Sequence, residues 1–420
     1  MNSCVLYIDP GTGAMLLTTI LGLVTTIGFV GKKIFFKVKF WLSGGKDKTY
    51  KQMDVKIPIV IFSDNKRYWY EFKGVCDELE RRAIPCCYWT ISEDDPALKE
   101  SYKYVKCSYI ESDNRAYVRL NSMNAYVCLS TTPGLDVYQW KRSKNTDWYV
   151  HVIHGIGDAA GYRMFGLEGF DAVLVAGEHH SEQIRKLEMV RHRNPKEIVI
   201  VGESYMDTLK KRYNERNDEH YDVKQRVVLL APSWGKSSLL VKYGEKIIDS
   251  LLKTGYEIII RPHPQSFSAD KEIMDRLMTK YNDSNTLVWD RSIDNFDSLN
   301  KADIMISDFS SVIWDYTFIF DKPVIYADVS FDSAPYDLAW LEEDRWDFRA
   351  LSLMGVNLKE EDFPRIKLLI DKAIDSDELR QERAKLREQA WKCQGEAAIR
   401  ITDYVTDKYM EFSEKNIEET

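Results

Sequence analysis

The chain has 420 residues, of which 30% are charged and 12% aromatic, and its formal net charge at pH 7 is −8. This length allows two α/β domains with large cores, and the composition excludes an intrinsically disordered chain. The acidic balance, without a stripe of Lys and Arg interleaved with aromatic residues, predicts no nucleic-acid partner.

The first 54 residues form a segment of their own. "AMLLTTILGLVTTIGFVG" (14–31) carries no charge and runs about 18 residues, the lower limit for a bilayer span. "KKIFFKVKFWL" (32–42) then alternates lysines with large aromatic residues, as a headgroup-level segment does. Seven lysines against two aspartates give residues 1–51 a net charge of +5 and leave −13 for the rest.

The lysines follow the apolar run, whereas a secretory signal carries its positive charge before it. The sequence therefore predicts an uncleaved single-pass anchor at 14–31, with the body of the protein on the cytoplasmic side of the cell membrane. A buried core helix or a re-entrant hairpin remains the alternative for this short run. The seven cysteines lack a CxxC pair, which favours a reduced compartment and neither a zinc site nor a disulfide framework.

A polar linker (43–54) leads into alternating apolar strands and helices, typical of a parallel sheet covered on both faces. Strands are expected at 57–62, 86–90, 104–110, 125–130, 148–154, 170–177 and 197–202. The charged stretch 203–225 predicts a domain boundary, so residues 55–205 form a first Rossmann-like domain.

The second alternation predicts strands at 226–234, 256–264, 285–290, 303–311 and 322–328, in a second Rossmann-like domain over 206–358. The charged tail 359–420 is expected to be helical. Two such domains in tandem predict a cleft between the carboxyl ends of their strands, where the ligands of these sheets bind.

Three strand ends of the second domain carry polar residues suited to an anion. "LLAPSWG" ends with Ser233, "IIIRPHPQS" presents Arg261 and His263 between prolines, and "MISDFSSV" places Ser310 and Ser311 before a helix. Guanidinium, imidazole, hydroxyls and a helix N-terminus together predict a phosphate site. Asp308 is assigned to capping or to orienting the loop.

In the first domain, "VHVIHGIGD" predicts that His154 ends a strand at the cleft and acts as a general base. Thr132, Gly155 and Asp158 are placed beside it, on the acceptor side. His151 is expected to be a packed core residue. The pair His179–His180 could line the cleft, but a surface position is favoured.

No carboxylate cluster with ligand geometry falls at a strand end, so neither a metal site nor a cofactor is expected.

The run "APSWG…RPHPQS…ADIMISDFSSVIWDYTFIFDKPVIYAD", with "HVIHGIGD" upstream, resembles the CDP-glycerol glycerophosphotransferases of teichoic-acid and surface-polymer synthesis over residues 125–345. The resemblance implies a metal-independent glycosyltransferase-B fold and a CDP-activated donor on the second domain. It also implies that His154 is the base, that His263 and the serines bind the donor phosphates, and that Asp315 belongs to the donor-binding set.

We therefore expect an enzyme that transfers glycerol phosphate, or a related polyol phosphate, from a CDP donor to a hydroxyl of a lipid-linked glycan. A nucleotide-sugar glycosyltransferase or a sugar-nucleotide epimerase of the same fold is the alternative among enzymes. A catalytically inactive membrane scaffold that binds nucleotide is the alternative of another class. The polyol, the acceptor and the number of transfers stay open.

Overall fold

The structure is a computed structural model that describes residues 56–216, 225–292, 294–327, 329, 331–341 and 345–418. The chain divides into two compact units, Met1–Lys56 and Ile57–Thr420, and the elements below all belong to the second. The predicted anchor at 14–31 and the lysine-rich segment after it lie outside the described residues. Within the part of the chain that is described, no helix is both long and apolar enough to cross a membrane.

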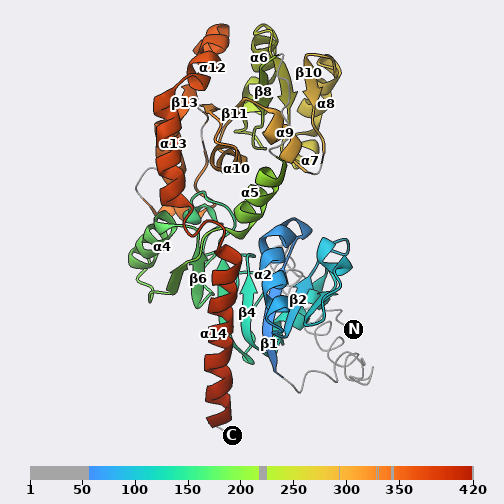
Figure 1. Cartoon of the computed structure of the whole chain (residues 1–420), viewed down its shortest axis with the longest axis vertical. Coiled ribbons are helices and arrows are strands. Elements are labelled where there is room, and N and C mark those ends of the chain that lie inside the picture. The colour runs from blue at the N-terminus through green and yellow to red at the C-terminus, as the bar shows by residue number, and fades with distance from the viewer. Residues whose placement is uncertain are drawn as a thin grey trace, which may run out of the picture. The chain divides into compact units, whose positions relative to one another are not determined.

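The first half of this unit forms a parallel sheet of seven strands in the order β3-β2-β1-β4-β5-β6-β7 (Figure 1). Its strands are β1 (Ile57–Ser63), β2 (Cys86–Thr90), β3 (Val105–Tyr109), β4 (Ala125–Ser130), β5 (Thr146–Val152), β6 (Ala172–Val175) and β7 (Glu197–Ile200). The connections carry α2 (Trp69–Arg81), α3 (Asn114–Asn121), α4 (Glu178–Val190) and α5 (Ser204–Arg216), with 3-10 turns η2 (Lys66–Tyr68), η3 (Pro96–Lys99) and η4 (Ala159–Gly161).

Burial on both faces explains why these strands are apolar throughout. In β1, Ile59 and Ile61 pack in one core with α2, while Val60 and Phe62 pack in another with α3. Because alternate residues of a strand point to opposite faces, a strand covered on both sides needs an unbroken apolar run. The strands predicted from such runs in this half are all present.

The second half forms a parallel sheet of six strands in the order β10-β9-β8-β11-β12-β13. Its strands are β8 (Val227–Leu230), β9 (Glu257–Ile260), β10 (Leu287–Trp289), β11 (Ile304–Ser307), β12 (Val324–Ala327) and β13 (Gly355–Leu358), the last of which was not predicted. The helices are α6 (Leu239–Leu252), α7 (Ser266–Ala269), α8 (Lys271–Lys280), α9 (Phe296–Lys301), α10 (Val312–Ile319) and α11 (Trp346–Met354), with 3-10 turn η5 (Asp337–Trp340).

The C-terminal helices connect the two halves. They are η6 (Glu360–Arg365), α12 (Ile366–Ile374), α13 (Asp377–Ala390) and α14 (Ala397–Glu418). α13 contacts α10 and α11, whereas α14 returns to the first half and runs beside α2 and β4 (Figure 1). Ile401 and Val405 of α14 are buried in the same core as Ile59. The tail is therefore helical, as expected, but α14 packs against the first sheet and contributes to its core. The expected domain boundaries at 205 and 358 stay predictions.

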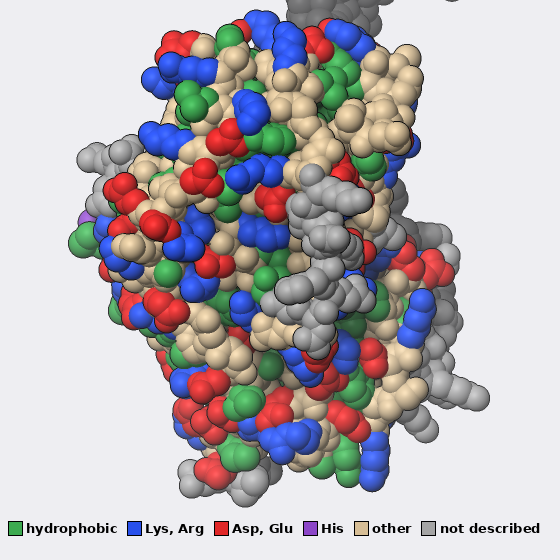
Figure 2. All heavy atoms as spheres, turned by 45° about the horizontal axis from the view of Figure 1, so that its top comes forward, with side chains coloured by type: hydrophobic (Ala, Val, Ile, Leu, Met, Phe, Trp, Pro, Cys, Tyr) green, Lys and Arg blue, Asp and Glu red, His purple; other side chains and the backbone are tan. Residues whose placement is uncertain are grey.

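Charged side chains of both signs are interspersed over the face drawn in Figure 2. The described residues of that face carry no broad field of one sign.

Candidate active site

Each sheet reverses its strand order beside its first strand, between β1 and β4 and between β8 and β11. Ligands of doubly wound sheets bind outside the carboxyl ends of the strands at this reversal. Asp64, Arg67, Thr131 and Thr132 follow β1 and β4 there, and Ser233, Ser310 and Ser311 follow β8 and β11. His154 and His263 follow the neighbouring strands β5 and β9.

The imidazole of His154 is oriented by the strand end next to it. Nδ1 of His154 lies 2.6 Å from Oγ1 of Thr131. Thr131 donates its only hydroxyl proton to the carbonyl oxygen of Val152 at 2.8 Å, so its oxygen can only accept from the imidazole. Nδ1 of His154 therefore carries the ring hydrogen, and Nε2 is left as an unprotonated acceptor, as a general base requires.

The backbone turns sharply directly after this histidine. Gly155 has φ +88°, a left-handed conformation that a residue with a Cβ rarely adopts. Its N–H donates to Oε1 of Glu203 at 3.3 Å. Gly155, predicted on the acceptor side, thus shapes the turn that presents His154.

Two tyrosines contact His154. The ring of Tyr68 has its centroid 4.6 Å from that of His154, and the hydroxyl of Tyr162 lies 3.2 Å from both Nδ1 of His154 and Nε2 of His151. Burial, and then the charge of Arg67, lower the pKa of His154 to about 4. His154 is therefore neutral at pH 7. His151 is fully buried, as predicted.

In the second sheet, Asp308 organises the loop after β8. Its Oδ1 accepts the N–H of Ser233 at 2.8 Å, and its Oδ2 accepts the N–H of Leu239, the first residue of α6, at 2.9 Å. Asp308 was predicted to cap or orient its own loop, and the structure shows that it orients the loop after β8. The hydroxyl of Ser233 is buried and finds no hydrogen-bond partner in the described part of the chain.

Ser310 and Ser311 lead into α10. Ser311 is its N-cap residue, but its side chain makes no capping bond. The N–H groups of Ser310, Ser311 and Val312 have no acceptor among the residues that the structure describes. These free donors, at the positive end of the helix dipole, can bind an anion.

His263 follows β9 and presents a hydrogen-bond donor. Nδ1 of His263 accepts the N–H of Gln265 at 3.2 Å, which leaves the ring hydrogen on Nε2. Burial, and then Arg67, lower the pKa of His263. Its ring lies near that of Trp234, with centroids 6.2 Å apart and planes tilted by 31°. The neutral ring can therefore donate from Nε2 to a phosphate oxygen.

Arg261, predicted to bind phosphate, is held by its own domain. Its guanidinium forms an ion pair with Asp290 and donates to the carbonyl oxygen of Ser292 at 2.8 Å. The side chain is 13% exposed. Its role in donor binding stays a prediction, and the structure commits most of its hydrogen bonds elsewhere.

Asp315, also predicted to bind the donor, lies in an acidic environment. Burial, and then the charge of Glu203, raise the pKa of Asp315 well above its usual range. Burial and Glu203 likewise raise the pKa of Glu71, whose carboxyl group hydrogen-bonds that of Glu203. A neutral Asp315 would be a hydrogen-bond donor instead of a repelling charge. Its assigned role stays a prediction.

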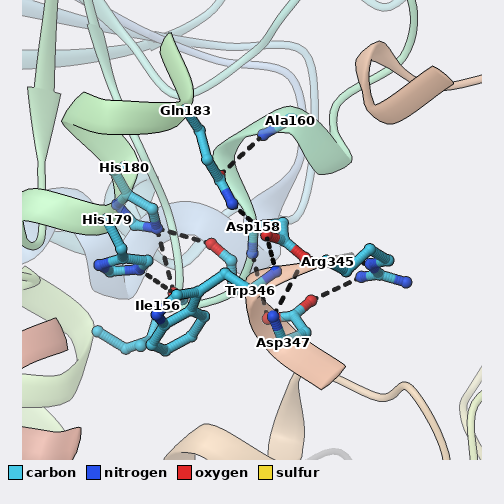
Figure 3. Close-up of polar contacts among 10 residues, drawn as sticks. Ile156, Asp158, Ala160, His179, His180, Gln183, Arg345, Trp346 and Asp347 are labelled. Carbon is cyan, nitrogen blue, oxygen red and sulfur yellow. Dashed lines mark hydrogen bonds and ion pairs between the residues drawn. The ribbon is translucent and has the colours of Figure 1, made fainter. Parts of the chain in front are cut away.

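Asp158, whose place on the acceptor side stays a prediction, joins the two halves of the unit (Figure 3). Its carboxylate accepts from the N–H of Trp346 at 3.0 Å and from Nε of Arg345 at 3.1 Å. In return, the N–H of Asp158 donates to Oδ1 of Asp347 at 3.2 Å. Burial and then Asp158 raise the pKa of Asp347 to about 8. We call these contacts of Asp158 with residues 345–347 the clasp.

His179 and His180 are buried, so the favoured surface position was wrong. Nε2 of His179 donates to the carbonyl oxygen of Ile156 at 2.7 Å, and Nε2 of His180 donates to that of Gly157 at 2.6 Å (Figure 3). The ring of Trp346 stacks on His179 at 4.1 Å. The two histidines hold the loop that follows His154.

Arg67 and Tyr68 were not predicted. Both follow the carboxyl end of β1, so the rule that selected His154 applied to "SDNKRY" as well. Thr132, which was selected, donates its N–H to Oγ of Ser130 at 3.0 Å. Among the described side chains, no group of three or more His, Cys, Asp or Glu is arranged to hold a metal ion.

Comparison with protein families finds a match over residues 163–407 to the model described as CDP-Glycerol:Poly(glycerophosphate) glycerophosphotransferase. This range is more than half of the chain. It includes the predicted donor-side residues and begins after His154.

Among solved structures, a variant of the wall teichoic acid polymerase TagF, soaked with CDPG, matches with a TM-score of 0.58 and 17% identity over 90% of this chain and 97% of that one. UDP-GlcNAc 2-epimerase from Methanocaldococcus jannaschii, in complex with UDP-GlcNAc and UDP, matches with a TM-score of 0.53 and 11% identity over 83% and 99%. At these identities the likeness shows the fold alone, which is α/β with parallel sheets and similar to glycosyltransferase-B enzymes. Comparison with curated protein sequences finds no significant match.

Proposed function

Because the chain belongs to the CDP-glycerol:poly(glycerophosphate) glycerophosphotransferase family, and is a transferase of that type, we propose that it moves glycerol phosphate from CDP-glycerol to a hydroxyl of a lipid-linked glycan. The observation that carries this proposal is the complementary state of two histidines on different sheets. His154 offers an unprotonated Nε2, and His263 offers an N–H donor. His154 can therefore deprotonate a hydroxyl, and His263 can donate a hydrogen bond to a phosphate.

In the proposed reaction, Nε2 of His154 takes the proton of the acceptor hydroxyl as its oxygen attacks the β-phosphorus of the donor. The new P–O bond forms as the bond from the β-phosphorus to CMP breaks, and CMP leaves with the electron pair. His263 and the free N–H groups before α10 stabilise the negative charge on the phosphates. Positioning and electrostatics supply most of the rate, since a general base contributes about 10²–10⁴-fold.

A pKa of about 4 makes His154 a weak base in the free protein. The donor carries negative charge that opposes the field of Arg67, so its binding raises the pKa of His154. The base thus gains strength when the donor is present.

We further propose that residues 14–42 attach the chain to the cytoplasmic side of the membrane, where a lipid-linked acceptor is available. The uncharged run at 14–31 and the lysine–aromatic alternation after it support this proposal.

A thermal-shift series with CDP-glycerol, CDP-ribitol, UDP-GlcNAc and CMP tests the donor class, because a ligand that binds only the folded protein raises its melting temperature. We expect a CDP-polyol to raise it more than UDP-GlcNAc or CMP at the same concentration. Stabilisation by UDP-GlcNAc without any by the CDP-polyols would overturn the proposal in favour of a sugar-nucleotide enzyme. The polyol that stabilises more identifies the donor.

The variant His263→Asn tests the donor side of the site. Loss of its hydrogen bond to a phosphate should weaken CDP-glycerol binding about 10- to 100-fold in calorimetric titration. Wild-type affinity in this variant would remove His263 from the donor site.

A further inference from the structure

Arg67 lies in η2, the turn directly after β1, and contacts Tyr68, which in turn contacts His154. Its guanidinium is centred 4.6 Å from the ring of Tyr68 and donates to the Tyr68 hydroxyl at 2.6 Å. The ring of Tyr68 also contacts that of His154, at 4.6 Å between centroids. The N–H of Arg67 donates to Oδ1 of Asn65 at 3.1 Å, which fixes the turn. The arginine is thereby placed beside the proposed base.

No carboxylate that the structure describes balances the charge of Arg67. The side chain is exposed, and no carboxylate of the described chain forms an ion pair with it. Asp64 acts on it only at longer range. Arg261, by contrast, is paired with Asp290. A guanidinium that forms no ion pair within the described residues is available to a ligand, and its planar fork suits phosphate oxygens.

Arg67 also acts on both sheets. Its positive charge lowers the pKa of His154, which follows a strand of the first sheet, and of His263, which follows a strand of the second. The guanidinium is therefore close enough to both strand ends to act electrostatically on groups that lie between them.

We propose that Arg67 binds the diphosphate of the donor at its β-phosphate, so that the first sheet supplies the cation that faces the phosphorus under attack. This inference rests on the proposed function for the identity of the donor. Arg67 then exchanges the Tyr68 hydroxyl for phosphate oxygens, while the ring of Tyr68 keeps the guanidinium next to His154. The same side chain would align the donor with the base and balance the charge that develops on the phosphoryl group.

The full-length variants Arg67→Gln, Arg67→Lys and Lys66→Gln test this inference by calorimetric titration with CDP-glycerol and with CMP. CMP lacks the β-phosphate. Arg67→Gln should weaken CDP-glycerol about 10- to 100-fold and CMP less than about threefold, since one charge-assisted contact to the β-phosphate is lost. Arg67→Lys keeps the charge but not the planar fork, so its affinity for CDP-glycerol should lie between those of wild type and Arg67→Gln. Lys66, in the same turn, pairs with Asp94, and its variant should bind both ligands as wild type does.

Equal binding of CDP-glycerol by Arg67→Gln and wild type would overturn the inference, as would an equal loss for CDP-glycerol and CMP. The same titrations with UDP-GlcNAc and UMP separate this result from a failure of the proposed function. If wild type binds UDP-GlcNAc but not CDP-glycerol, the proposed function fails. The role of Arg67 is then decided by whether Arg67→Gln loses more affinity for UDP-GlcNAc than for UMP. If wild type binds neither diphosphate, both proposals fail.

Discussion

At the scale of single residues, the proposed base depends on a threonine. Thr131 gives its hydroxyl proton to Val152 and receives the Nδ1 hydrogen of His154, so one side chain sets both the tautomer and the ring orientation. Serine can make the same two bonds, and valine can make neither. Thr131 is therefore a positioning residue that acts through His154.

The variant Thr131→Val should lower kcat about 10- to 100-fold, a part of the contribution of a general base, because the tautomer is no longer fixed. The dissociation constant for CDP-glycerol should change little, since Thr131 acts through the tautomer of His154. Thr131→Ser should restore most of kcat. Steady-state kinetics with calorimetry checks this, and an active Thr131→Val variant, or an inactive Thr131→Ser variant, would contradict the tautomer assignment.

The position of a residue could be predicted from the sequence where chain direction decides it, but not where tertiary contacts do. His154 and His263 follow apolar strands, and the strand pattern places them at the carboxyl edges. The positions of His179 and His180 depend on the carbonyl oxygens of Ile156 and Gly157, which lie in another segment. Arg261 fits a phosphate site by residue type, but its partner Asp290 lies 29 residues away. No local pattern reveals such pairs.

At the scale of elements, the last helix of the chain, α14, packs against the first sheet and buries part of its core. Ile401 is 1% exposed in the core that also holds β1 and α2, whereas Ile399, two residues earlier, is 47% exposed. The two isoleucines therefore form a matched pair on one helix.

Ile401→Ala should reduce the free energy of unfolding by about 2–5 kcal/mol, through lost burial and the cavity that remains. Ile399→Ala should cost less than about 0.5 kcal/mol. Urea unfolding of both variants measures the difference. Equal effects of the two substitutions would mean that α14 does not pack on the sheet as described.

The clasp joins two elements, and its stability depends on the protonation of Asp347. The folded pKa of Asp347, about 8, is raised above its ordinary value. Between those two values the unfolded chain has lost this proton and the folded chain keeps it, so stability falls as pH rises. Asp347→Asn should remove this dependence between the two pKa values.

Unfolding of wild type and Asp347→Asn from pH 5 to pH 8 tests the clasp. The wild-type stability should fall more steeply, and Asp377→Asn, at an exposed position on α13, should keep the wild-type slope. Parallel slopes for wild type and Asp347→Asn would show that Asp347 is ionised throughout this range.

The sequence predicted the buried central strands of the second sheet but not the strand at one of its edges. Both-sided burial demands continuous apolar runs such as "VVLL" and "IMIS", which are visible in the sequence. β13, "GVNL", lies at the edge of its sheet, where fewer residues are buried and a polar residue is tolerated. Its strand is formed by pairing with β12, a contact that the local sequence does not specify.

At the scale of the whole molecule, the chain combines two parallel sheets with a basic, apolar N-terminal segment of +5 net charge. The full-length protein should therefore sediment with membranes. Replacing Lys32, Lys33, Lys37 and Lys39 with Gln should weaken this attachment, by about 1 kcal/mol for each charge near an anionic surface. Fractionation with and without high salt measures it. Full-length protein in the high-speed supernatant would contradict the membrane proposal.

Release of CMP from CDP-glycerol tests the central claim most directly, measured for the full-length protein and for His154→Asn with a hydroxyl acceptor present. The account predicts acceptor-dependent CMP release by wild type. In His154→Asn it predicts a rate lower by about 10²–10⁴-fold with nearly unchanged CDP-glycerol affinity, because the base contributes to the chemical step and not to donor binding. Wild-type turnover in His154→Asn, or binding of CDP-glycerol by wild type without any CMP release, would contradict it.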